Sequence, residues 1–223
     1  MSLLFRKADY FSTPSNPFFE EKKVNSGKQI GAIKLDYNKS LAIFEVEWND
    51  KNLRPTWFWW EPEGNNLSTQ WRTTPLMYDW NKDDLMDLIM LDHEGYLAFF
   101  ERIKKDGELK LLEGKRIFYN EKNEPLQLNI KEAGGSGRRK LTIVDWDLDG
   151  KLDLLINSKN VSFFKNISSE VDKVVFKDMG MVCEQILAGH TTSPTIVDWN
   201  QNGIPDLLIG AEDGYFYYLK NPN

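Results

Sequence analysis

Short apolar runs alternate with Asp- and Asn-rich segments through the last two thirds of the chain. In the last copy of this pattern, the apolar run 195–197 precedes a polar loop, 207–209 follows it, and the aromatic run 215–219 comes third. Runs this short, rich in β-branched and aromatic residues, are typical of β-strands and too short for helices. The pattern therefore predicts a strand, a polar loop, a second strand, a turn and a third strand.

The same pattern occurs three times along the chain. The aromatic runs 96–100 and 161–164 correspond to 215–219 of the last copy. The intervals between copies leave room for a fourth strand, which we expect at 116–119 and 173–176. Four antiparallel strands per unit form the blade of a β-propeller, so the expected fold class is all-β: a propeller, or a segment of one, with Asp-rich calcium loops.

The three polar loops share one arrangement of oxygen-bearing side chains. They begin at Asp79, Asp145 and Asp198, and Asp or Asn recurs at loop positions 3, 5 and 9. Such side chains converge on one hard cation when the backbone turns sharply near position 6, where Gly150 and Gly203 stand. Calcium prefers this ligand set, with a backbone carbonyl from position 7. The predicted metal ligands are Asp79, Asn81, Asp83, Leu85 and Asp87 in the first loop, Asp145, Asp147, Asp149, Lys151 and Asp153 in the second, and Asp198, Asn200, Asn202, Ile204 and Asp206 in the third.

The loops differ in their number of carboxylates at these positions, which predicts an order of affinity. The second loop has four, the first has three and the third has two. Asp84 stands at position 6 of the first loop, where a positive φ would add a steric cost. We expect two to three structural calcium ions per chain, with the strongest site in the second loop. The alternative is that these loops are turns in which Asp and Asn bond their own backbone.

A tryptophan follows the first Asp of each loop, at Trp80, Trp146 and Trp199. Sugar stacking is one interpretation of these rings. Because all three occupy the same place in a structural repeat, we favour packing in the core between blades.

Residues 79–89, 145–155 and 198–208 resemble the FG-GAP or VCBS repeat of integrin-type propellers and bacterial secreted proteins. The stretch 187–194 is similar to bacterial propellers that accompany or form polysaccharide-degrading enzymes. The resemblance covers approximately residues 70–223. It implies a propeller with calcium in its strand-connecting loops and a location outside the cytoplasm, either secreted, periplasmic or at the cell surface.

One structural domain is expected. It would consist of repeats at 71–135, 136–188 and 189–223, with an N-terminal region, 1–70, that supplies an atypical blade and a closing strand. Propellers close with about four to eight blades, so either a small ring or a piece of a larger ring fits. Blade edges left open would favour oligomerisation.

The edge of the sheets away from the loops is the expected ligand site. If the first strand of each copy runs into its loop, the strand starts and the second turns share the opposite edge. Arg binds a carboxylate or sulfate bidentately, His bonds a hydroxyl or transfers a proton, and Trp offers a flat face to a sugar. We predict an acidic saccharide there, and the aromatic run 57–60 is a second candidate for sugar contact. The alternative is a solvated basic turn with a locally bonded histidine. The predicted ligand residues are Trp71, Arg72, His93, Arg138, Arg139 and His190.

No catalytic constellation stands out, since the sequence lacks a nucleophile elbow, an HExxH helix and a phosphate-binding glycine loop. If the chain is an enzyme, a polysaccharide lyase or a glycosidase is expected, with His190, His93 and Arg72 as the catalytic candidates. The favoured hypothesis is a calcium-binding propeller module that binds or helps to process polysaccharide. A protein-interaction or adhesion module and a structural appendage of a separate catalytic domain are the alternatives.

Charge and composition exclude several partners. The formal net charge is −6, and nine aspartates lie in the three loops, so bound divalent ions would neutralise the chain. No Lys/Arg-rich stripe is present, which argues against nucleic acid. No apolar run reaches the roughly 20 residues that span a bilayer, and the first residues lack the layout of a signal peptide. The lone Cys183 excludes an internal disulfide.

Overall fold

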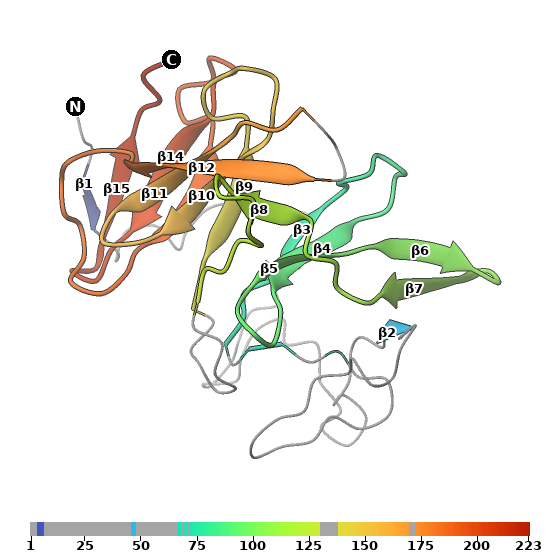
Figure 1. The fold of residues 1–223 in the computed structure, drawn as a ribbon. Helices are drawn as coiled ribbons and strands as arrows, with labels where there is room; N and C mark the ends of the chain where they lie inside the picture. Colours follow the sequence, from blue (N-terminus) through green and yellow to red (C-terminus); the bar gives the residue numbers. More distant parts are fainter. Residues whose placement is uncertain are drawn as a thin grey trace, which may run out of the picture.

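The computed structural model describes residues 4–6, 46–47, 67, 69–70, 72–129, 138–169 and 173–223. Every regular element in this part of the chain is a β-strand, which confirms the all-β fold class (Figure 1). None of the described residues form a helix that is long and apolar enough to cross a membrane.

Each of the three copies forms a three-stranded antiparallel meander. The strands are β3 (Leu76–Tyr78), β4 (Asp87–Leu91) and β5 (Leu97–Phe100) in the first copy, β9 (Leu141–Val144), β10 (Asp153–Asn157) and β11 (Val161–Asn166) in the second, and β13 (Ser193–Val197), β14 (Asp206–Gly210) and β15 (Tyr215–Leu219) in the third. The registers agree, because Met77 pairs with Leu88, Ile143 with Leu154 and Ile196 with Leu207. The predicted order of strand, loop, strand, turn and strand is confirmed.

A fourth strand extends the second and third sheets. In the second sheet, β12 (Val174–Met181) pairs antiparallel with β11, as predicted for 173–176. In the third sheet, β1 (Leu4–Arg6) pairs antiparallel with β15. Residues from the start of the chain therefore supply the outer strand of the last copy.

The fourth strand predicted at 116–119 for the first sheet is wrong. Residues there form β8 (Phe118–Asn120), which pairs parallel with β12 and so belongs to the second sheet. The physical reason is the side chain of Phe118, which is fully buried and stacks on Phe176 with ring centroids 6.0 Å apart.

A β-hairpin replaces the missing strand of the first copy. It consists of β6 (Arg102–Lys105) and β7 (Glu108–Leu112), and β2 (Val46–Glu47) pairs parallel with β7. Leu111 of the hairpin packs against Leu88, Met90 and Phe100. The hairpin thereby contributes Leu111 to the apolar cluster on one face of the first sheet.

Two apolar clusters join the consecutive copies face to face. The first includes Ile89 and Leu91 of the first sheet with Leu154 and Ile156 of the second. Strand alternation places Leu155 on the other face of β10, where it packs in the second cluster with Leu207 and Ile209 of the third sheet. The second sheet is thus packed on both faces (Figure 1). The described strands form four separate sheets, and none closes into a ring.

The tryptophans follow the same order of packing. Trp80 packs edge to face on Phe118 at 5.3 Å, and Trp146 is buried in the cluster shared with the third sheet. The prediction of a core position is confirmed for Trp146, and Trp80 is partly buried against the first cluster. It is wrong for Trp199, which is 37% exposed. Its ring lies 6.2 Å from the ring of Tyr218 of the same copy, in a tilted arrangement.

Candidate metal centre

The first carboxylate of each loop organises the backbone of that loop. Asp145 accepts the N–H of Asp149 at 3.0 Å on Oδ1 and the N–H of Gly150 at 2.9 Å on Oδ2. Asp79 and Asp198 accept the equivalent pairs of N–H groups at 2.9–3.1 Å. The loops therefore share one hydrogen-bond network, independent of their differences in charge.

Two residues of each loop adopt a positive φ. At position 6, φ is 67° for Asp84, 87° for Gly150 and 81° for Gly203, as the sequence predicted. Position 4 was missed: φ is 61° for Lys82, 62° for Leu148 and 57° for Gln201. None of these three residue types favours the left-handed region, so only the common loop geometry could have indicated it.

The carboxylate at position 9 is fully buried in all three copies. In the second loop, Asp153 accepts the N–H of Trp146 at 3.0 Å and the N–H of Asn166 at 2.8 Å. One carboxylate thus joins the start of the loop to the end of β11. Asp87 makes the matching bonds to Trp80 and Arg102, and Asp206 accepts from Tyr218 and Asn221.

Burial raises the pKa of Asp153 to about 6, although the two backbone N–H donors oppose this shift. The pKa of Asp87 is raised for the same reason. The carboxylates of Asp87 and Asp153 are buried, and their hydrogen bonds hold the backbone at the start of each loop and in a later strand.

Three carboxylates converge in the second loop. Asp145, Asp147 and Asp149 each offer an oxygen within 4.8 Å of the others. Asp147 Oδ1 is buried and has no hydrogen-bond partner. An oxygen without a partner among three carboxylates is the environment that a hard cation satisfies, so the donor set fits calcium.

A lysine of the neighbouring strand enters this group. Lys165 of β11 donates a hydrogen bond from Nζ to Asp147 Oδ2, and Nζ lies 3.1 Å from Asp149 Oδ2. The contact with Lys165 lowers the pKa of Asp149. Sequence reasoning missed this residue, since it counted loop charges alone. The strand register would have indicated it, because Phe164 pairs with Leu154 and Lys165 therefore lies beside the end of the loop.

The other two loops have asparagine at some of these positions. In the first loop, Asn81 donates from Nδ2 to Asp83 at 3.1 Å and accepts the Asp83 N–H at 3.1 Å. In the third loop, Asn200 accepts the N–H of Asn202 at 3.1 Å. Side-chain oxygens are held by the same backbone in all three loops, while the charge that they carry differs.

The strand starts and second turns meet at the opposite edge of the sheets. Glu212, in the turn between β14 and β15, accepts the backbone N–H groups of Gly189, His190 and Thr191 at 2.9–3.2 Å. His190 Nδ1 lies 3.0 Å from Glu212 Oε1, and the histidine side chain is 92% exposed. Although partial burial opposes it, these N–H donors lower the pKa of Glu212, which holds the charge at the turn.

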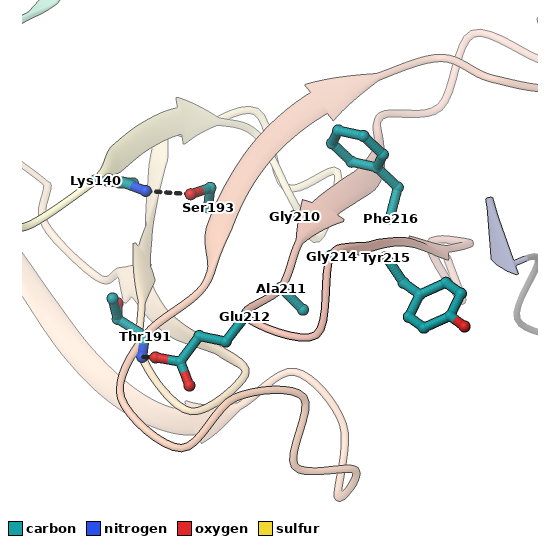
Figure 2. A pocket seen from close by; sticks show the side chains of 9 residues that line it. All are labelled: Lys140, Thr191, Ser193, Gly210, Ala211, Glu212, Gly214, Tyr215 and Phe216. Atoms are coloured by element: carbon teal, nitrogen blue, oxygen red, sulfur yellow. Dashed lines mark hydrogen bonds between the residues drawn. The ribbon is translucent and has the colours of Figure 1, made fainter. Parts of the chain in front are cut away.

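A cavity of about 350 Å³ lies at this edge, between the start of β9 and the strands of the third sheet. Figure 2 shows Lys140 donating to Ser193 at one side of it, with Glu212 at the backbone of Thr191. Tyr215 and Phe216 supply its aromatic surface. The cavity thus combines an ammonium group, the Glu212 carboxylate, hydroxyls and aromatic rings, and sequence reasoning missed Lys140.

The structure places the predicted ligand residues unevenly. Asn157 Nδ2 donates to the carbonyl of Arg138 at 2.9 Å and to the hydroxyl of Thr191. The backbone of Arg138 therefore lies near Thr191, the residue that follows His190. Arg139 Nε donates to the Leu128 carbonyl at 2.8 Å, and burial lowers the pKa of Arg139. This arginine joins the first copy to the second.

The predicted ligand residues of the first copy lie at its own edge. Arg72 is exposed in a turn with φ 60°, and His93 lies in the turn between β4 and β5. Arg116, which precedes β8, forms ion pairs with two residues of that turn, Asp92 at 2.7 Å and Glu94 at 2.6 Å. Trp71 and the aromatic run 57–60 lie outside the described residues.

Comparisons with known protein families, with curated proteins and with solved structures each found no match.

Proposed function

We propose that this chain is a calcium-binding β-repeat module whose three sheets are blades of an FG-GAP/VCBS-type propeller. The observation that carries the proposal is the unpartnered Asp147 Oδ1 within a group of three carboxylates. The same loop backbone recurs in the other two copies, which supports two to three ions per chain.

In the second loop, Asp145, Asp147 and Asp149 would hold the ion through their side chains, and Lys151 through its carbonyl. Each carboxylate oxygen that accepts one N–H keeps a second lone pair, so the backbone network and a metal are compatible. A bound calcium ion would neutralise the clustered charge and fix the loop. Its role is structural, since it links the end of β9 to the start of β10.

Face-to-face packing of consecutive sheets supports the propeller part of the proposal. The second sheet packs on both faces, and a strand from the start of the chain pairs with the last sheet. Completion of the last blade by the start of the chain is what ring closure requires. A further sheet beside Trp199 would cover its exposed ring.

A saccharide site at the edge away from the loops is the second part of the proposal. The cavity beside Lys140 supports it, because an ammonium group and hydroxyls bind sugar carboxylates and hydroxyls while aromatic rings pack on the sugar face. Its volume lies at the lower end of the usual range for ligand pockets. An acidic sugar unit of a polysaccharide outside the cytoplasm fits this chemistry.

Thermal unfolding in calcium and in EDTA tests the metal part. Calcium at a hundredfold excess over Kd stabilises a site by about 2.7 kcal/mol. For a chain of this size this raises Tm by about 5–10 °C. Asp147→Asn should reduce the calcium-dependent rise, while Glu184→Ala, an exposed acid outside the loops, should leave it unchanged. Equal Tm values in calcium and EDTA for the unmodified chain would contradict the proposal.

Titration calorimetry with an oligouronate and with its neutral counterpart tests the saccharide part. We expect preferential binding of the acidic oligosaccharide and a loss of about tenfold or more in Lys140→Met, with Lys159→Met as the exposed control. Equal binding of both sugars, or no binding of either, would exclude the acidic-saccharide site. In that case the adhesion alternative would become the better hypothesis.

A further inference from the structure

The second loop already contains a positive charge from its own blade. Lys165 Nζ hydrogen-bonds Asp147 and lies 3.1 Å from Asp149 Oδ2, so one ammonium group contacts two of the three clustered carboxylates. An ammonium group is a compact charge with three donors, and it competes with a metal ion for the same oxygens.

Each copy has a residue at the position equivalent to Lys165. The pairs Leu88–Phe100, Leu154–Phe164 and Leu207–Leu219 are equivalent in register. The residues that follow the second member of each pair are Glu101, Lys165 and Lys220. They therefore occupy the same place beside their loops.

The equivalent residues behave differently. Glu101 carries a negative charge and forms an ion pair with Lys115 at 2.9 Å. Lys220 is exposed beside a loop that has Asn200 and Asn202 in place of aspartates. Only the second copy combines a lysine at this place with aspartate at loop positions 3 and 5.

We infer that Lys165 acts as the built-in counter-cation of the second loop and that calcium binds there by displacing its ammonium group. The inference rests on the proposed calcium binding by the loops. The number of carboxylates predicts the highest calcium affinity for the second loop. Lys165 lowers that affinity, because it neutralises part of the negative charge of this loop.

The displacement is open to the side chain. Lys165 is 30% exposed, and its four-carbon stem is flexible, so the ammonium group has a path into water. Asp147 Oδ1 has no hydrogen-bond partner even with the lysine in place. The ammonium group thus leaves part of the ligand set unsatisfied, and a divalent ion gains these oxygens when it replaces the lysine.

Calorimetric titration of the full chain with calcium chloride tests the inference. Lys165→Met keeps the apolar stem and removes the charge, and Lys220→Met is the matched control in the third copy. We expect Lys165→Met to tighten one site by about tenfold or more, since two partly exposed ion pairs are removed. Lys220→Met should leave all affinities within about twofold. Lys165→Gln serves as a second variant that keeps a polar end.

Combining Lys165→Met with Asp147→Asn shows which calcium site is affected. Asp147→Asn weakens the second loop, so the gain from Lys165→Met should disappear in the double variant. If the unmodified chain binds calcium, Asp147→Asn removes a site, and Lys165→Met changes no affinity, the inference is overturned and the proposed calcium binding stands. If neither the unmodified chain nor Lys165→Met binds calcium, the proposed function fails and the inference fails with it.

Discussion

Replacing Phe118 by alanine tests the packing between the first two copies. The Phe118 side chain is fully buried, with Trp80 at 5.3 Å in an edge-to-face contact and Phe176 at 6.0 Å in a stacked one. Truncating a buried phenylalanine costs about 3–5 kcal/mol of unfolding free energy through lost burial and the cavity left behind. With two aromatic neighbours in contact, we expect Phe118→Ala to lie in the middle of this range, at about 4 kcal/mol.

Urea unfolding followed by tryptophan fluorescence measures this loss. In thermal unfolding, about 4 kcal/mol corresponds to a fall in Tm of about 8–16 °C for a chain of this size. Ile117→Ala is the matched control, because Ile117 precedes Phe118 and is only partly buried. We expect about 1–2 kcal/mol for this control.

A loss below about 1 kcal/mol in Phe118→Ala would refute the placement of Phe118 in the apolar cluster shared by the first two sheets. Phe118 would then lie on an exposed edge, as expected for a fourth strand of the first sheet. Equal losses in Phe118→Ala and Ile117→Ala would contradict the placement as well, since they would show no difference in burial between the two side chains.

Three further predictions concern the loops and the turn of the first copy. Gly150→Ala should cost about 1 kcal/mol of unfolding free energy in urea, because alanine is strained at φ 87° while a Cβ there meets no atom within 4 Å; no loss would contradict the strained conformation. The pKa of Asp153 in the folded protein is about 6, above its ordinary 3.8, so the folded state binds an extra proton as pH falls. In EDTA, the contribution of Asp153 to the free energy of unfolding should therefore rise by about 1 kcal/mol between pH 7 and pH 5. A rise of the same size in Asp153→Asn would assign the effect to other groups. Arg116→Ala breaks contacts with Asp92 and Glu94 and should cost about 1–2 kcal/mol, whereas an unchanged urea midpoint would show that these ion pairs do not stabilise the turn.

The alternation of polar and apolar residues was sufficient to predict the meander of each copy. Strands β13, β14 and β15 follow the predicted runs, and positive φ occurs at position 6 of each loop. Both features are local, because strand length and turn geometry depend on a few neighbouring residues. A single sequence carries this information directly.

Contacts between distant segments were not predictable in the same way. The sheet that β8 joins depends on the burial of Phe118 against Phe176, and nothing near Phe118 in the sequence indicates this partner. Lys165 was missed for a related reason, since a charge count treats the loop apart from the strand that runs beside it. The contact between Arg139 Nε and the carbonyl of Leu128 was likewise not indicated by residues near Arg139 in the sequence.

The number of calcium ions bound per chain tests the central claim most directly. Equilibrium dialysis followed by elemental analysis measures it for the unmodified chain and for a variant that combines Asp79→Asn, Asp145→Asn and Asp198→Asn. We expect two to three ions per unmodified chain and fewer than one in the variant, with far-UV circular dichroism showing that both are folded. No bound calcium in the unmodified chain, or an equal number in the folded variant, would contradict the assignment of the loops as calcium sites.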